Sequence, residues 1–233
     1  MDVHGYSSEY IKRSQAVTGC FAMFVLFFGL TFVPLFIENS RELMVSGYLF
    51  PVLFGLEFLV ITPLYYFCFR RREGLGRGQF RAGVCLVLFL CILFVQLILP
   101  FFTGTRQTEA WSASQIGLEG HVFWLNATMM VLAVPVYEEM IFRGCLFSVF
   151  RFWCRNNVYA AAAAVSVLFS ACHLQYMDWR SFLILFLVSL ILVAGRVITG
   201  GILMPVILHM LMNATITGIG YVAHLQTAGG ASG

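Results

Sequence analysis

The sequence has few charged residues. Only 11% of its 233 residues are charged and 60% are hydrophobic, whereas about a quarter of the residues of an average soluble domain are charged. A soluble surface cannot be built from this composition, so we expect an integral membrane protein whose main partner is the lipid bilayer. The net charge of +3 is too small, and too scattered between apolar runs, to indicate a nucleic-acid partner.

Several motifs of hydrolytic enzymes are also missing. No His-Glu-x-x-His motif is present for a zinc site, and the only aspartates are Asp2 and Asp178, so the paired Gly-Asp motif of an aspartyl protease is excluded. The sequence has no Gly-x-Ser-x-Gly nucleophile motif. None of the seven cysteines forms a Cys-x-x-Cys pair, which favours small apolar residues over metal ligands or disulfides.

Long apolar runs are abundant instead. A helix needs about 20 such residues to cross the hydrocarbon core, and the runs predict an all-α, polytopic membrane helix bundle with seven or eight transmembrane helices. The predicted spans are Ala16 to Ile37, Val45 to Phe69, Ala82 to Phe102, Val122 to Phe142, Val158 to Cys172, Phe182 to Ile198 and Ile202 to Val222.

The basic residues predict the topology. The densest group falls between the second and third runs and comprises Arg70, Arg71, Arg72, Arg77 and Arg81, which is typical of a cytoplasmic loop. With a cytoplasmic N-terminus, the polar stretch from Thr103 to Gly120 then lies outside. We divide the chain into an N-terminal membrane scaffold (residues 1–121), a catalytic helix bundle (122–226) and a disordered tail (227–233).

Ionisable groups inside membrane helices are costly and indicate function. Glu139 and Arg143 are four residues apart and share a helix face, so they can neutralise each other. Glu138 lies about 100° around the helix from Glu139, which leaves this carboxylate free for proton transfer. The two glutamates are therefore predicted to have different roles.

Two histidines follow on later helices. His173 lies one turn after Phe169, whose ring could shield the imidazole from water, and His209 lies four residues before Asn213 on one helix face, where both could donate to an oxyanion. If the chain turns near Asn156 and Asn157, His173 is level with about residue 140, close to Glu138. The same count leaves His209 about 10 Å short of that level.

The ordered set Glu138-Glu139-x-x-x-Arg143, Phe169-x-x-x-His173 and His209-x-x-x-Asn213 resembles the CPBP family. This family comprises type II CAAX prenyl endopeptidases and bacteriocin-processing or Abi-like intramembrane proteases. The resemblance covers about residues 122 to 222 and implies a metal-independent glutamate protease. It implies that Glu138 and His173 activate water, that His209 and Asn213 stabilise the oxyanion, and that Glu139 and Arg143 support them.

Other interpretations stay open at this point. A zinc site could be built from Glu138, His173 and His209, although no cofactor is expected. A proton-coupled or ion-coupled transporter could use Glu57 with the same buried groups, and a non-catalytic membrane partner could keep the fold.

The substrate is also open. A prenylated peptide, the leader of a small secreted peptide or a segment of a membrane protein would suit the same chemistry. We expect a multi-pass protein of a prokaryotic plasma membrane, because the chain is compact and has no targeting extension. Glu57 has no assigned role. It could line the same cavity or pair with a polar group on another helix, and the second interpretation is favoured.

Overall fold

The computed structural model describes residues 3–72, 75–104 and 109–230, and the prediction of an all-α fold is confirmed over these residues, in which no strand occurs. Its elements are α1 (Val3–Leu30), η1 (Val33–Phe36), α2 (Ser40–Val45), α3 (Leu49–Cys68), α4 (Ala82–Leu93), η2 (Phe94–Ile98), α5 (Leu99–Thr103), α6 (Ala110–Ile116), α7 (Gly120–Thr128), η3 (Met129–Ala133), α8 (Val134–Glu139), η4 (Met140–Leu146), α9 (Phe147–Trp153), α10 (Val158–Ala171), α11 (Trp179–Thr199) and α12 (Leu203–Gly230).

Five helical segments are long and apolar enough to cross a bilayer. They are Arg13–Leu30, Leu49–Cys68, Ala82–Thr103, Trp179–Thr199 and Leu203–Thr227. Many large apolar side chains on these segments are exposed, as expected for a surface that contacts lipid. The chain is therefore an integral membrane protein with five candidate spans among its described residues.

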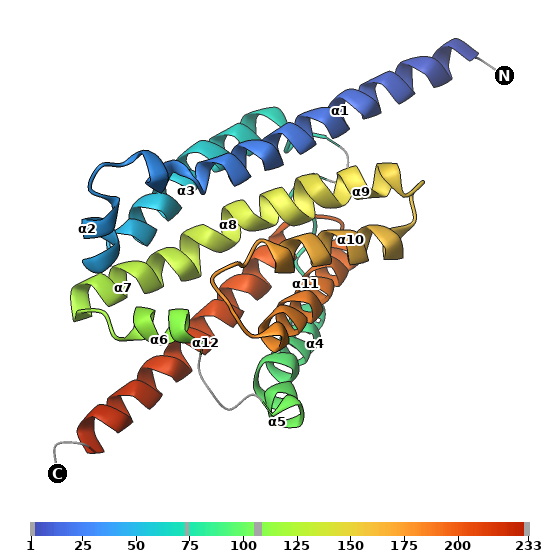
Figure 1. Ribbon diagram of the computed structural model, residues 1–233. Helices are drawn as coiled ribbons and strands as arrows, with labels where there is room; N and C mark the ends of the chain where they lie inside the picture. Colours follow the sequence, from blue (N-terminus) through green and yellow to red (C-terminus); the bar gives the residue numbers. More distant parts are fainter. Residues whose placement is uncertain (1–2, 73–74, 105–108, 231–233) are drawn as a thin grey trace.

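The remaining two predicted spans have a different form. Residues 120–153 make one continuous helical segment that contains π-helical turns (Figure 1). The predicted span Val158 to Cys172 corresponds to the short helix α10, which has 14 residues. The total of seven or eight spans thus stays a prediction, as do the topology and the division into a scaffold and a catalytic bundle. Helix α12 reaches Gly230, inside the predicted tail, and residues 231–233 lie outside the described part.

The π-helical segments η2 and η3 have a local cause. Pro135 occupies the first turn of α8 directly after η3, and Pro100 does the same in α5 directly after η2. Proline has no N–H and its ring clashes with the carbonyl four residues earlier, so an α-helical hydrogen bond is lost there. A π turn before the proline accommodates this loss without ending the helix.

The helices pack in two groups. One apolar core lies where α1, α3, η4, α9 and α10 meet, and the second lies between α4, α11 and α12. In Figure 1, α12 crosses the long 120–153 segment at an angle, and it contacts α8 and η3. The polar groups of the site lie at this crossing, between the two cores.

Two glycines allow close approach between distant segments. A Cβ on Gly144 would lie 2.6 Å from the Tyr65 hydroxyl, so only glycine lets α3 pack this closely on η4. A Cβ on Gly201 would meet the backbone of Gly78 at 2.2 Å. The arginine-rich loop hydrogen-bonds the α11–α12 turn at this point, through Gln79 N–H and the Thr199 carbonyl at 2.9 Å.

Candidate active site

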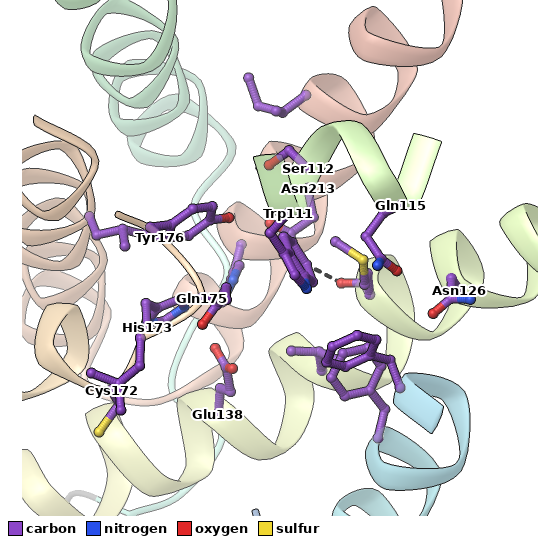
Figure 2. A pocket seen from close by; sticks show the side chains of 18 of the residues that line it. Trp111, Ser112, Gln115, Asn126, Glu138, Cys172, His173, Gln175, Tyr176 and Asn213 are labelled. Carbon is purple, nitrogen blue, oxygen red and sulfur yellow. Dashed lines mark hydrogen bonds between the residues drawn. The ribbon is translucent and has the colours of Figure 1, made fainter. Parts of the chain in front are cut away.

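A cavity of about 560 Å³ lies beside the helix crossing and receives all four residues that were predicted to be catalytic. Glu138, His173, His209 and Asn213 all line it. Figure 2 shows Glu138 on α8 and His173 on the loop after α10 extending into the same space, with Trp111 and Ser112 of α6 on the opposite side. The tertiary structure therefore brings these four side chains to one cavity.

The two adjacent glutamates have different surroundings, as the helix geometry indicated. Glu139 is fully buried, and its Oε1 accepts a hydrogen bond from Arg143 Nη1 at 2.8 Å. Glu138 lines the cavity instead, and its buried Oε2 has no hydrogen-bond partner among the described residues. One carboxylate is thus neutralised inside the bundle, while the other faces the cavity.

Arg143 is held from several sides. The guanidinium lies 4.3 Å from the centre of the Phe169 ring and also reaches the Ser189 carbonyl at 3.5 Å. A buried charge is stable only when it is paired and hydrogen-bonded. Since Arg143 is 0% exposed, these contacts fix the side chain that in turn fixes Glu139.

His209 joins this group from α12. Its Nδ1 lies 2.8 Å from Glu139 Oε1, the same oxygen that Arg143 contacts. A carboxylate only accepts hydrogen bonds, so Nδ1 carries the proton. The gap of about 10 Å that residue counting left is closed because α12 crosses the long helix at an angle, which counting along parallel axes does not include.

His173 follows the end of α10, which closes the predicted hairpin. The turn lies where it was expected, with Arg155 and Asn156 at positive φ and Asn157 capping α10 through bonds to the N–H groups of Tyr159 and Ala160. The His173 Nδ1 donates to the Phe169 carbonyl at 2.8 Å, so the unprotonated Nε2 remains available as an acceptor.

Phe169 connects the two histidines. Its ring centre lies 4.6 Å from that of His173 and 6.3 Å from that of His209. The predicted contact of this ring with His173 is therefore present, and the same ring also covers Arg143.

Asn213 is oriented by the π turn on the neighbouring helix. Its Nδ2 donates to the Met130 carbonyl at 2.8 Å. In the π register, this carbonyl would pair with the residue five positions later, which is Pro135 and has no N–H. One amide proton of Asn213 is used in this bond, which leaves its second N–H for the cavity.

Glu57 contributes a carboxylate from α3. It is 3% exposed, lines the cavity, and is hydrogen-bonded by the Tyr137 side chain. Both readings of this residue thus apply, because it pairs with another helix and also borders the cavity. The sequence signal for Glu57 was the position of this carboxylate inside an apolar run.

Sequence reasoning missed the residues that close the cavity on the side of α6. The cavity is lined by Trp111, Ser112, Gln115 and Tyr176. These residues lie between the predicted spans, in segments that the sequence predicts only as loops. A tryptophan inside the polar stretch before α7 is the signal that could have indicated a packed element.

The described residues offer no preformed metal centre, since no group of three or more histidine, cysteine, aspartate or glutamate side chains is placed to hold an ion. Glu139 and His209 bind each other rather than a common point. Metal independence nevertheless stays a prediction.

The fold and this set of buried polar groups define a helical membrane protein with a cavity that is lined by carboxylate, imidazole and amide side chains. Residues 120–215 match the sequence model of the family described as type II CAAX prenyl endopeptidase Rce1-like. This segment carries all four predicted catalytic residues, and the match supports the predicted resemblance to the CPBP family. The matched family is one of endopeptidases.

A protein of Escherichia coli described as "Uncharacterized 24.3 kDa protein" is 41% identical over 92 residues, which are 40% of this chain and 41% of the relative. The match thus spans about two fifths of each protein. No solved structure matches the chain.

Proposed function

We propose that the protein is an intramembrane endopeptidase that hydrolyses a peptide bond with water activated by Glu138 and His173. One observation carries the proposal: Glu138 borders the cavity with an unpartnered carboxylate oxygen, while Glu139 directly beside it is bound by Arg143 and His209. An unpaired carboxylate in a membrane helix bundle costs stability, so its presence indicates a function. The match to an endopeptidase family supports this reading.

The proton transfers follow from the donors and acceptors. Glu138 accepts a proton from water, and the resulting hydroxide attacks the substrate carbonyl carbon. His173 Nε2, which the bond from Nδ1 to Phe169 leaves as an acceptor, orients that water. Glu138 then returns the proton to the leaving amine as a general acid, as proton transfer in both directions requires.

The oxyanion is stabilised from α12. Asn213 offers its second amide N–H, and His209 offers Nε2–H when its imidazole is protonated. The bond from Nδ1 to Glu139 orients this donor before the reaction, and donors that are already oriented stabilise a developing oxyanion.

We propose that the substrate is a peptide that carries a prenyl group. Apolar rings dominate the wall built by the N-terminal helices, where Phe27, Phe28, Phe32, Phe50 and Phe54 line the cavity. A mainly apolar wall with few polar groups suits a ligand with an apolar portion. Such a wall next to Glu138 would place the lipid away from the scissile bond, which stays close to the polar groups.

The decisive experiment uses the purified full chain in lipid nanodiscs. A quenched fluorescent peptide with a farnesylated cysteine is compared with the same peptide without the lipid. We expect cleavage of the farnesylated peptide by the wild type and none by Glu138→Gln. Persistent cleavage by a folded Glu138→Gln variant would contradict the proposed role of this carboxylate.

Two further arms separate the alternatives. A chelator should leave cleavage unchanged, whereas reversible loss on chelation and recovery with Zn²⁺ would indicate a metal mechanism. Absence of cleavage, together with proton movement across proteoliposomes that Glu138→Gln abolishes, would favour the transporter. In cells, a comparison of peptides and membrane proteins between wild type and Glu138→Ala identifies the natural substrate.

A further inference from the structure

Helix α6 and the residue before it lie outside the segment that matches the endopeptidase family, yet they form one side of the cavity. Trp111, Ser112 and Gln115 of this helix line the cavity together with Glu109, which precedes it. Figure 2 shows Trp111 and Ser112 across the cavity from Glu138, with Tyr176 between them and His173.

Glu109 attaches α6 to the loop that carries His173. Its Oε1 accepts hydrogen bonds from the Ser181 hydroxyl at 2.6 Å and from the Asp178 N–H at 3.1 Å. Its Oε2 accepts from the Met177 N–H at 3.4 Å. Hydrogen bonds to an ionised carboxylate are stronger than those between neutral groups, so one side chain holds residues 177–181 at the start of α11.

Tyr176 carries the connection on to His173. The Ser112 side chain is hydrogen-bonded to Tyr176, and the ring of Trp111 meets that of Tyr176 edge to face with the centres 5.9 Å apart. On its other side, Tyr176 lies parallel to the His173 imidazole, with an interplanar angle of 4° and ring centres 6.3 Å apart. The order of contacts is therefore α6, Tyr176 and His173.

His173 requires such support because of its position. Helix α10 ends at Ala171, and His173 lies in the loop beyond it. Its contacts with Phe169 fix one ring nitrogen and one side of the ring. The Tyr176 ring lies parallel to the imidazole, and Glu109, Trp111 and Ser112 contact Tyr176 and its loop from outside α10 and α11.

We propose that Glu109 and Tyr176 are positioning residues, through which the docked helix α6 holds His173 in the orientation that water activation needs. The inference rests on the proposed function, and it assigns part of the working site to a region outside the family match. Misplacement of a catalytic group by about 1 Å costs roughly 100-fold in rate, so release of this loop should lower turnover while substrate binding is retained.

The test compares Glu109→Ala with Glu119→Ala in the full chain in nanodiscs. Glu119 is a matched control, because its side chain is 84% exposed and only approaches His121 at 4.0 Å. Two quantities are measured: the rate at which diethyl pyrocarbonate modifies His173, followed by mass spectrometry, and kcat and KM for the farnesylated peptide.

We expect Glu109→Ala to raise the His173 modification rate several-fold and to lower kcat by about 10- to 100-fold, with KM nearly unchanged. Glu109→Gln keeps one acceptor oxygen for the loop and should recover part of both effects. Glu119→Ala should match the wild type. Equal values for Glu109→Ala, Glu119→Ala and the wild type would overturn the inference.

A second pair of variants covers the case in which Glu109→Ala does not fold. Tyr176→Phe keeps the ring beside His173 and loses only the bond to Ser112, whereas Tyr176→Ala also removes the ring. A larger rise in His173 modification for alanine than for phenylalanine supports the positioning role, and equal, wild-type rates for both contradict it. Because the modification rate does not require cleavage, failure of the proposed function appears separately, as a wild type that cleaves nothing.

Discussion

The cavity has two walls of different character. The wall from residues 120–215 holds the polar groups, which are bound to each other: Arg143 and His209 meet on Glu139, and Asn213 is held by Met130. The wall from residues 27–57 is mainly aromatic, and Glu57 is its buried ionisable side chain.

This difference separates two tasks. Chemistry needs groups at fixed distances, so its wall is a network in which each member orients another. Recognition of an apolar ligand needs shape and area, which phenylalanine side chains supply without hydrogen bonds. We therefore expect changes in the first wall to affect turnover or stability, and changes in the second wall to affect substrate preference.

The largest effect is expected for Glu138→Gln. The amide has the same shape but cannot accept a proton, and general acid–base catalysis contributes about 10²- to 10⁴-fold, so cleavage should fall by that factor. Thermal unfolding should stay close to that of the wild type, because the buried Oε2 has no partner to lose. A folded variant that retains activity would move the general base to another residue.

Arg143→Met should mainly lower stability. Removal of one partner of a buried ion pair costs about 3–5 kcal/mol because an uncompensated charge remains, and Arg143 and Glu139 are both 0% exposed. The free energy of unfolding in detergent measures this loss. The double variant Arg143→Met with Glu139→Gln should regain part of it, and strictly additive losses would show that the two side chains are not coupled.

Asn213→Ala should lower kcat by about 100-fold, the cost of losing one oxyanion donor, with little change in KM. Thr215→Ala is the control on the same helix, since Thr215 is half-buried, does not line the cavity, and bonds its own turn at Leu211. Steady-state kinetics with the farnesylated peptide distinguish the two. A rise in KM without loss of kcat would assign Asn213 to substrate binding.

The smallest effect on catalysis is expected from the aromatic wall. Phe54→Ala removes a ring that lines the cavity and should raise KM for the farnesylated peptide by a factor that corresponds to about 1–3 kcal/mol. Phe67→Ala, on the same helix but 79% exposed, should change nothing. An equal effect of Phe54→Ala on the peptide without the lipid would break the proposed division between the two walls.

Most of the site residues could be predicted because their signals are local. Glu139 and Arg143 are one turn apart, which places them on one face, and Glu138 must then point elsewhere. The hairpin at Asn156 and Asn157 set His173 near the level of Glu138. These steps depend only on helical geometry within neighbouring segments.

The contacts that could not be predicted join distant segments. His209 reaches Glu139 because α12 crosses the long helix at an angle, and Glu109 reaches Ser181 across 72 positions of sequence. Neither the crossing angle nor the docking of a seven-residue helix such as α6 leaves a periodic signal. Composition also could not predict the number of spans. The 120–153 segment contains π-helical turns, and α10 is short.

By itself, the sequence determined that the chain is a helical membrane protein and that Glu138 and Glu139 lie on different sides of one helix, since hydropathy and helical spacing act over one or two turns. Only the tertiary structure decided which groups meet: His209 with Glu139, Asn213 with the Met130 carbonyl, and Tyr176 with His173. These contacts depend on crossing angles, on a proline-induced π turn and on a docked short helix, which are set by packing between segments far apart in the chain.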